Sequence, residues 1–446
     1  MANADTIAAT ATAPGRGGIG VLRVSGPRVP AIAEAMLGAC PRPRHATLGD
    51  FRDADDRLID QGLALYFPAP HSYTGEDVLE LQGHGGVAVQ RLLLARALAL
   101  GARLAEPGEF TKRAFLAGKL DLAQAEAVAD LIDAASAQAA RSAARSLEGE
   151  FSRRVDALVA GLVEARMYLE ATLDFPEEEL EGHAASRTRA DVAALLGQVR
   201  DVERAASAGR LLREGLRVVL AGQPNVGKSS LLNRLAGDEV AIVTALPGTT
   251  RDPIRETLSL EGIPLHVTDT AGLRETTDAV ERIGVEKAWG ALAKADVVLL
   301  VLDAREGRRV ADRAVLARVP AGVPVVEVHN KIDLGCEAAR VPGEEGASAV
   351  FVSALTGEGM DDLKRAVLAL AGRVPSTEGA FMARERHVRA LARARTHLEG
   401  AGEPGLGPEL VAEELRLAQE ALNTITGAFG ADDLLGEIFS RFCIGK

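Results

Sequence analysis

One stretch of the chain has the residue types and spacing of a phosphate-binding loop. Residues 222–229 read Gly-Gln-Pro-Asn-Val-Gly-Lys-Ser and fit the pattern G-x-x-x-x-G-K-[ST]. The glycines allow backbone N–H groups to turn toward a phosphate at the start of a helix, where the helix dipole also favours negative charge. In this pattern Lys228 would reach the β- and γ-phosphates of a nucleotide, and the Ser229 hydroxyl would coordinate Mg²⁺.

The segments around this loop predict the elements that must position it. Residues 217–221 are an apolar run typical of a buried strand, and residues 230–235 have a helical pattern. Strands and helices alternate up to about residue 373, which predicts a mostly parallel sheet with helices on both faces. The predicted strands are 217–221, 265–268, 297–302, 323–328 and 350–352. Ligands bind beyond the carboxyl ends of such strands, so the polar motifs that follow four of them should converge.

Two of these motifs have the residues needed around Mg²⁺ and a γ-phosphate. Thr250, in the sequence Gly-Thr-Thr-Arg-Asp, is the candidate second hydroxyl ligand of Mg²⁺. The motif Asp269-Thr270-Ala271-Gly272 directly follows a predicted strand. Asp269 would hold the Mg²⁺ through water, and the Gly272 N–H would contact the γ-phosphate.

Two later motifs predict which base is bound. In Asn330-Lys331-Ile332-Asp333 the Asp333 carboxylate can accept from the N1 and N2 hydrogens of guanine, a donor pair that adenine lacks. In Ser353-Ala354-Leu355 a backbone N–H can donate to guanine O6. The motifs occur in the order found in G proteins, so the sequence predicts a GTP-binding domain.

Leu273 follows the motif Asp269-Thr270-Ala271-Gly272, and its side chain bears on which residue orients the attacking water. Ras-type GTPases have a glutamine directly after this motif, and it orients the attacking water. A leucine side chain cannot do so, and a polar group must come from elsewhere. Glu275 and Glu281 are the nearby candidates, although glutamate is most often a solvated surface residue.

Length, composition and charge limit the number of domains, the kind of partner and the cellular location. The 446 residues suggest about three domains, and the net charge of −12 argues against a generally basic nucleic-acid coat while allowing a local patch. The three cysteines, Cys40, Cys336 and Cys443, have no disulfide or metal spacing, which favours a reducing cytosol. Neither a signal peptide nor an apolar run of about 20 residues is present, so we expect a cytoplasmic protein without a membrane span.

The chain in order predicts a helical domain interrupted by the G domain. An α/β segment with strands at 19–24, 62–67 and 78–82 comes first. Residues 120–147 are Ala-rich and nearly free of Gly and Pro, which predicts one helix of roughly 40 Å. Helices are also expected at 151–173, 186–212 and 411–425, on both sides of the G domain. The predicted domains are 1–118 (α/β), 119–213 (helical, first part), 214–375 (Ras-like P-loop G domain) and 376–446 (helical, second part).

Several further segments resemble the bacterial and organellar family of tRNA modification GTPases called MnmE or TrmE. They are residues 13–20, 73–77, 80–86, 107–113, 118–122, 174–178 and the terminal Phe-Cys-Ile-Gly-Lys of 442–446. The resemblance implies a potassium-dependent GTP hydrolase. With a flavin partner protein called MnmG or GidA, in a heterotetramer, it would add an aminomethyl or carboxymethylaminomethyl group to C5 of the wobble uridine of certain tRNAs.

The resemblance also implies roles for residues outside the G domain. Domain 1–118 is similar to a fold that binds 5-formyl- or 5,10-methylene-tetrahydrofolate and forms a constitutive homodimer. The matching folate-binding positions are Arg23, Glu80, Lys119 and Lys446. Cys443 matches a cysteine needed for modification, although by itself it could be a small residue in a terminal tail.

Within the G domain, the resemblance implies a cation site and a catalytic glutamate. Asn225, Thr244, Leu246 and Thr249 match the family's potassium ligands. Glu281 matches the glutamate that orients the attacking water, which agrees with a hydrophobic residue at Leu273. The positions expected to contact GTP are Asn225, Val226, Gly227, Lys228, Ser229, Ser230, Thr244, Ala245, Leu246, Pro247, Gly248, Thr249, Thr250, Asp269, Thr270, Ala271, Gly272, Asn330, Lys331, Ile332, Asp333, Ser353, Ala354 and Leu355.

Two other functions share the G-protein motifs. A regulatory switch would use GTP to control assembly without taking part in base chemistry, and the folate-like domain and Cys443 are the features that discriminate between the two functions. A ribosome-assembly GTPase of the Era or EngA type would need a basic RNA-binding domain. The terminal segment here is helical in pattern and ends at Lys446 instead.

Overall fold

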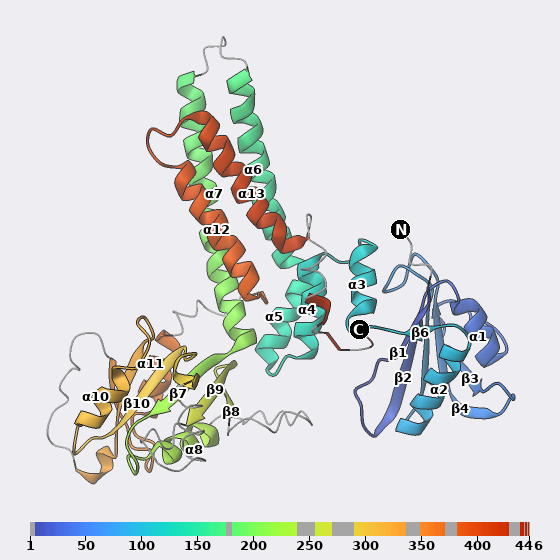
Figure 1. Ribbon diagram of the computed structural model, residues 1–446, viewed down its shortest axis with the longest axis horizontal. Helices are drawn as coiled ribbons and strands as arrows, with labels where there is room; N and C mark the ends of the chain where they lie inside the picture. Colours follow the sequence, from blue (N-terminus) through green and yellow to red (C-terminus); the bar gives the residue numbers. More distant parts are fainter. Residues whose placement is uncertain are drawn as a thin grey trace. The chain divides into compact units, whose positions relative to one another are not determined.

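The computed structural model describes residues 5–174, 181–238, 255–269, 290–335, 348–370, 381–427, 438–440, 442, 443 and 445. These residues form two compact units, whose elements are labelled in Figure 1. The first unit is drawn from Met1–Ala129, Leu147–Val163 and Arg416–Lys446, and the second from Asp130–Ser146 and Glu164–Leu415. Across these described ranges, no helix combines the length and apolar character needed to cross a bilayer.

The first unit contains a six-stranded sheet in the order β3-β4-β5-β2-β1-β6. Neighbouring strands are antiparallel except β1 and β6, which are parallel. The predicted strands at 19–24, 62–67 and 78–82 lie within β2, β4 and β5. The strands are β1 (Ile7–Thr10), β2 (Gly17–Ser25), β3 (Thr47–Arg52), β4 (Leu58–Phe67), β5 (Val78–Gly85) and β6 (Arg103–Leu104).

Helices cover the two faces of this sheet unequally. α1 (Val29–Leu37) and α2 (Val87–Ala99) pack on one face, where Met36 and Leu93 lie in a single core with Leu22 and Leu81. α3 (Glu109–Leu116) places Phe110 in a smaller core with Ile7 and Ala9. Because side chains alternate along a strand, Ile7 and Ala9 belong to this second core while Ala8 belongs to the first.

The helix predicted over 120–147 is wrong as a single element, because the structure has two. α4 spans Leu122–Ile132 and α5 spans Ala137–Leu147. The Ser136 hydroxyl accepts a hydrogen bond from the Ala139 N–H at 3.1 Å, which caps the start of α5. The same hydroxyl donates to the Gly262 carbonyl at 2.9 Å. A cap and a tertiary contact therefore divide a segment whose composition alone favours one helix.

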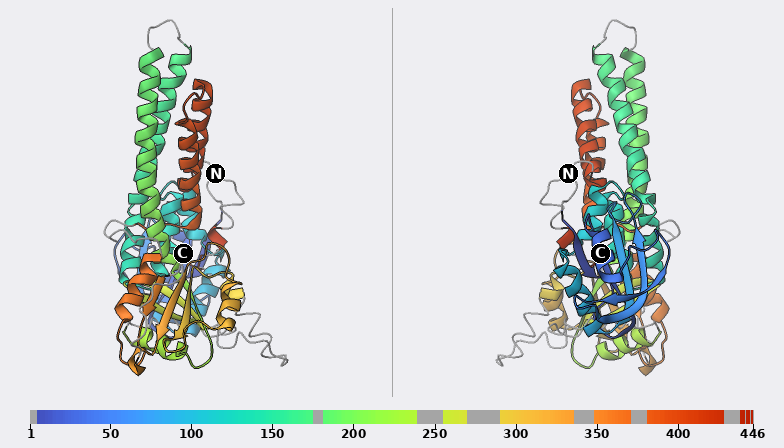
Figure 2. Two further views of the ribbon diagram at one scale, coloured as in Figure 1. Left: turned by 90° about the vertical axis from the view of Figure 1, so that its left-hand side faces the viewer. Right: turned by 90° about the vertical axis from the view of Figure 1, so that its right-hand side faces the viewer.

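The longer helices agree with the predicted pattern. α6 (Glu150–Asp174), α7 (Glu181–Glu214) and α13 (Pro408–Thr426) contain the segments predicted as helical, and α12 spans Glu385–Ala401. The last turns of α6 run beside the start of α7, as Figures 1 and 2 show, and the Arg187 guanidinium lies 4.2 Å from the centre of the Tyr168 ring. α12 packs along α7, with Arg395 bonded to Glu203 at 2.9 Å.

The second unit contains a six-stranded sheet in the order β12-β11-β10-β7-β9-β8. All neighbouring pairs are parallel except β8 and β9, which confirms the predicted mostly parallel sheet. The strands are β7 (Leu216–Ala221), β8 (Arg255–Leu260), β9 (Ile263–Asp269), β10 (Val297–Asp303), β11 (Val325–Asn330) and β12 (Ser348–Phe351). The 3₁₀ turn η1 (Ile332–Leu334) follows β11.

Both faces of this sheet are covered, as expected for buried parallel strands. α8 (Lys228–Asp238) and α11 (Met360–Leu370) pack on one face, where Leu231 and Leu363 share a core with the strands. On the other face, Val315 of α10 (Val310–Leu316) packs with Leu300. This arrangement fixes the carboxyl edge of the sheet, where the predicted motifs lie.

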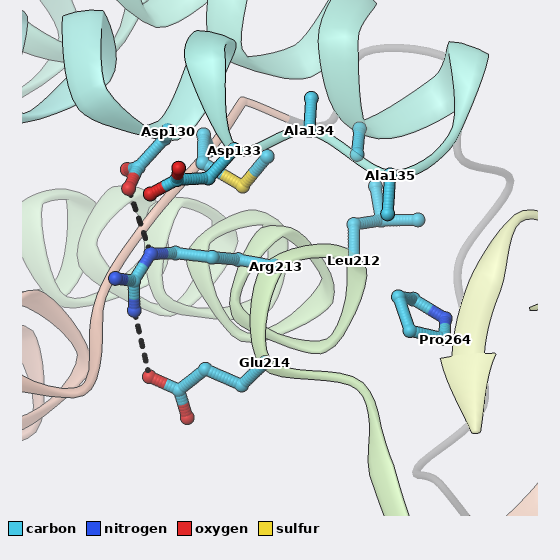
Figure 3. A pocket seen from close by; sticks show the side chains of 10 residues that line it. Asp130, Asp133, Ala134, Ala135, Leu212, Arg213, Glu214 and Pro264 are labelled. Carbon is cyan, nitrogen blue, oxygen red and sulfur yellow. Dashed lines mark hydrogen bonds and ion pairs between the residues drawn. The ribbon is translucent and has the colours of Figure 1, made fainter. Parts of the chain in front are cut away.

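The chain leaves and rejoins the helices at one place. Figure 3 shows Arg213, at the end of α7, directed at Asp130, with Nε 2.8 Å from Oδ1. Arg384, just before α12, donates to the same oxygen at 2.8 Å. At Gly209 a Cβ atom would lie 1.8 Å from the Phe381 carbonyl oxygen, so the returning chain requires glycine there. The predicted fold is confirmed: a G domain is inserted into a discontinuous helical domain.

Candidate functional site

The phosphate loop connects β7 to α8 at the carboxyl edge of the sheet. Its backbone has positive φ at Gly222 (139°), Asn225 (65°) and Gly227 (97°). A Cβ atom on Gly222 would lie 2.2 Å from the Val301 carbonyl oxygen on β10, so only glycine fits. The geometry that the pattern predicts is therefore set by close packing against the neighbouring strand.

Lys228 lies across this loop. Its side chain is buried, and its Nζ donates to the carbonyl oxygens of Gly222 at 2.9 Å and Gln223 at 3.0 Å. Two backbone carbonyls thus hold the ammonium group over the loop. Ser229 and Ser230, in the first turn of α8, are exposed and accessible to a ligand.

Asn330 joins the phosphate loop to the segment that follows β12. Its side-chain N–H donates to the Val226 carbonyl at 2.9 Å, and its side-chain oxygen accepts from the Ala354 N–H at 3.0 Å. Asn330 is buried, so both polar ends of the amide are satisfied inside the protein. A Cβ atom on Gly227 would lie 2.3 Å from the Asn330 side-chain nitrogen, which shows how closely the two segments approach.

Lys331 makes a second link between the same segments. Its Nζ donates to the Asn225 carbonyl at 2.6 Å and to Asp303 Oδ2 at 3.0 Å. Asp303 also accepts from Arg305, at 2.9 Å from Nε and 2.7 Å from Nη2. The hydrogen bonds from Arg305, together with the one from Lys331, hold the pKa of Asp303 well below its usual range.

Sequence reasoning missed Asp303. It is the last residue of β10 and lies opposite Asn330 in the parallel pair of β10 with β11. The available signal was the one used for Asp269, namely an acidic residue where a buried apolar strand ends.

The residues predicted to recognise the base, Asp333 and Ser353-Ala354-Leu355, lie in the loops that follow β11 and β12. Asp333 is exposed, and its Oδ1 accepts from the Ser353 hydroxyl at 2.5 Å. Ser353 is fully buried and Ala354 nearly so, whereas Leu355 is exposed. Ile332 N–H donates to the Val352 carbonyl at 3.3 Å and ties the two loops together. The carboxylate of Asp333 is therefore held in place and open to a base.

Several predicted residues lie outside the described residues. They are Thr244, Ala245, Leu246, Pro247, Gly248, Thr249, Thr250, Thr270, Ala271, Gly272, Leu273, Glu275, Glu281, Cys336 and Lys446. Asp269 is described as the last residue of β9, opposite Leu220 of β7. This register places it at the same edge of the sheet as the phosphate loop.

The first unit brings together part of the predicted folate set. Arg23 on β2 and Glu80 on β5 form an ion pair at 2.8 Å. Arg23 also donates to the Gly445 carbonyl at 3.3 Å, and the centres of the Tyr73 and Phe110 rings each lie 5.7 Å from its guanidinium carbon. A cation, a carboxylate and two aromatic rings therefore meet beside the terminal segment.

The remaining predicted residues of this unit lie on two other segments. Lys119 is exposed and lies beside Gly75, in the loop that follows Tyr73. A Cβ atom added to Gly75 would lie 3.6 Å from the Lys119 Cε. Cys443 is an exposed free thiol, and its carbonyl accepts from the Gly108 N–H at 3.4 Å.

A buried arginine that the sequence analysis missed supports the loop with Tyr73. Arg113 is 2% exposed and binds Glu109 at 2.9 Å and Glu76 at 3.0 Å. The Tyr73 hydroxyl lies 2.9 Å from Thr111 Oγ1 on the same helix. Both segments were recognised in the sequence, but their contact with each other was not.

Comparisons with known proteins cover nearly the whole chain. The family described as "GTP-binding protein TrmE N-terminus" matches residues 6–119, and the family "MnmE helical domain" matches residues 122–443. The tRNA modification GTPase MnmE of Nitrosomonas europaea is 56% identical over 451 residues, which span 100% of both chains. The protein of the same name from Laribacter hongkongensis is 59% identical and spans 99% of both.

Proposed function

Because this chain belongs to the MnmE family of tRNA modification GTPases, we propose that it hydrolyses GTP to drive addition of an aminomethyl or carboxymethylaminomethyl group to C5 of the wobble uridine of certain tRNAs. One observation carries the GTPase part. The Asn330 amide joins the phosphate loop to Ala354, so that the Lys228 ammonium and the Asp333 carboxylate are set at the two ends of one site. We assign 1–118, 119–213, 214–375 and 376–446 as its domains.

The phosphate end supports Mg²⁺ binding. The exposed Ser229 hydroxyl, in the first turn of α8, and Thr250 would hold the ion directly, and Asp269 would do so through water. Hydroxyl and carboxylate oxygens are the ligands that Mg²⁺ prefers. Lys228 is already placed to exchange its two carbonyl partners for phosphate oxygens.

Asn225, Thr244, Leu246 and Thr249 are the proposed potassium ligands. Asn225 is exposed and has its backbone carbonyl bound to Lys331, so its side chain projects from a fixed part of the loop. Amide, hydroxyl and backbone carbonyl oxygens form a donor set suited to K⁺. The cation would neutralise charge on the phosphates, and Glu281 would orient the attacking water.

The first unit would bind 5-formyl- or 5,10-methylene-tetrahydrofolate. Glu80 would accept from the pterin edge, its ion-pair partner Arg23 lies in the same cluster, and Lys119 and Lys446 would supply cations for the glutamate tail. The half-buried Tyr73 ring near Arg23 offers a surface for a flat heterocycle, whereas the Phe110 ring is enclosed in the core. We propose a homodimer that works with a flavin-dependent protein of the MnmG type in a heterotetramer, with tRNA as substrate, Cys443 as a catalytic residue and the cytoplasm as its location.

Two measurements test this function. GTP hydrolysis by the full-length protein should be faster in potassium than in sodium buffer at equal ionic strength. Equal rates would remove the potassium part of the proposal. A deletion strain complemented with wild type should regain its modified wobble nucleosides, whereas Cys443→Ser should hydrolyse GTP normally and leave them absent. Normal nucleosides with Cys443→Ser would favour a regulatory switch.

A further inference from the structure

Asp303 lies beside the segment Asn330-Lys331-Ile332-Asp333, which is expected to recognise guanine. It ends β10 opposite Asn330, and the Ala304 N–H donates to the Asn330 carbonyl at 2.8 Å. Asp303 is 5% exposed. A carboxylate at this depth needs partners, because a buried unpaired charge is costly.

The contact of Asp303 with Lys331 leads to the phosphate loop. Lys331 Nζ lies 3.0 Å from Asp303 Oδ2 and 2.6 Å from the Asn225 carbonyl oxygen. Lys331 and Asn225 both have left-handed backbones, with φ of 70° and 65°. This conformation is uncommon outside glycine, and asparagine tolerates it better than lysine does. One ammonium group thus joins two left-handed backbone positions, and Asp303 holds that group from the other side.

We propose that Asp303 is a positioning residue of the GTP site. Through Lys331 it fixes the backbone of Asn225, and so it couples guanine recognition to the loop that carries a potassium ligand. This inference rests on the proposed GTPase function and assigns a role to a residue outside its five motifs. Without the carboxylate charge, Lys331 loses its ion pair with residue 303 and keeps the Asn225 carbonyl, so its side chain gains freedom.

The test uses the full-length protein and the isosteric variant Asp303→Asn. Asp296→Asn is the matched control, because Asp296 lies just before β10, is exposed and accepts only from the Arg217 N–H among the bonds described, at 2.8 Å. The measurements are the Kd of a fluorescent GDP analogue and the potassium concentration that gives half-maximal GTP hydrolysis. Asp303→Asn should raise the Kd about tenfold, since a charged hydrogen bond is lost. It should also raise the half-maximal potassium concentration several-fold.

These readouts separate positioning from a purely structural role. Partial unfolding would lower the fraction of protein that binds GDP, but it would not change the Kd of the folded fraction. Lys331→Met provides the second check: in that background, adding Asp303→Asn should change the Kd little, because the two residues act as one unit.

Two results would overturn the inference. One is an Asp303→Asn protein that matches Asp296→Asn in both measurements. The other is an undiminished tenfold effect in the Lys331→Met background. If the wild type bound GDP but showed no potassium stimulation, the cation part of the proposed function would fail, and the Kd comparison would still decide the role of Asp303. A wild type that bound no GDP would remove both proposals.

Discussion

Arg23 on β2 lies directly opposite Glu80 on β5, and their side chains meet at 2.8 Å. Both are largely shielded from water, at 15% and 18% exposed, so each orients the other in a sheltered site. The Gly445 carbonyl accepts from the same guanidinium, which connects the terminal segment to the sheet.

Replacing this arginine should weaken folate binding. Arg23→Met keeps much of the apolar stem but loses the charge and the bonds to Glu80 and Gly445. We expect the Kd for 5-formyl-tetrahydrofolate, measured by calorimetry, to rise at least about tenfold. Arg57→Met is the control, since Arg57 is 76% exposed and pairs only loosely with Asp55, at 3.4 Å. Equal affinities for the two variants would contradict the assigned site.

Asp333→Asn should change which base is bound. The amide cannot accept both guanine hydrogens, and we expect GDP affinity to fall about 30- to 100-fold because a charged acceptor is lost. Xanthine has an oxygen where guanine has its amino group, so XDP should bind the variant better than GDP does. Competition between the two nucleotides measures this preference. An unchanged preference for GDP would mean that Asp333 does not contact the base.

Gly227→Ala should disrupt the phosphate loop. The new Cβ would lie 2.3 Å from the Asn330 side-chain nitrogen, on a backbone with φ of 97°. Such strain costs about 1–3 kcal/mol, and we expect GDP affinity to fall about tenfold or more. Gly307→Ala is the control, because it has φ of 65° and no atom within 4 Å of the added carbon. Gly307→Ala should bind GDP as the wild type does, and a loss of affinity shared by both variants would contradict the steric argument.

Glu281→Ala should slow hydrolysis without weakening GTP binding. A group that orients or activates water contributes about 10²- to 10⁴-fold to the rate. Single-turnover hydrolysis should therefore fall by at least about 10²-fold in Glu281→Ala and stay near wild type in Glu275→Ala. The reverse ranking would transfer the role to Glu275.

The protein should lose stability at high pH, where the Tyr66 hydroxyl ionises. Burial, together with the Asp77 carboxylate that accepts its O–H at 3.1 Å, raises the pKa of Tyr66 to about 12. An unfolded tyrosine ionises near about pH 10, so folding favours the neutral form. This contribution is complete below about pH 10 and is lost as the pH rises through about 12.

Denaturant unfolding at several pH values checks this prediction. Between about pH 10 and pH 12 the free energy of unfolding should fall less steeply in Tyr66→Phe than in the wild type. The control is Tyr168→Phe, because the Tyr168 ring lies against the Arg187 guanidinium. In this variant the free energy of unfolding should fall with pH as steeply as in the wild type. A slope unaffected by Tyr66→Phe would contradict the argument.

The sequence predicted the elements whose pattern is local and missed those that depend on distant contacts. The buried strands β7 and β10 have continuous apolar runs, so they were recognised. β8 reads Arg-Glu-Thr-Leu-Ser-Leu and is an edge strand, and its polar residues concealed it. The break between α4 and α5 depends on the bond from Ser136 to Gly262, 126 residues away, which no local pattern records.

The same distinction holds within the site. The phosphate loop and the motifs at Asn330 and Ser353 have fixed spacings, so the sequence alone was enough to place them at one edge of the sheet. Asp303 and Arg113 have no such spacing. Their importance follows from burial and from partners on other segments, Lys331 for the first and Glu76 for the second.

The shared carboxylate of Asp130 also bears on how such a chain could arise. Arg213 and Arg384 bind the same oxygen, so the chain leaves the helices and returns to them at neighbouring positions. A segment whose two ends are so close can be gained, lost or exchanged in evolution without moving the helices that flank it. A short linker in place of the insert should therefore leave α7 and α12 paired.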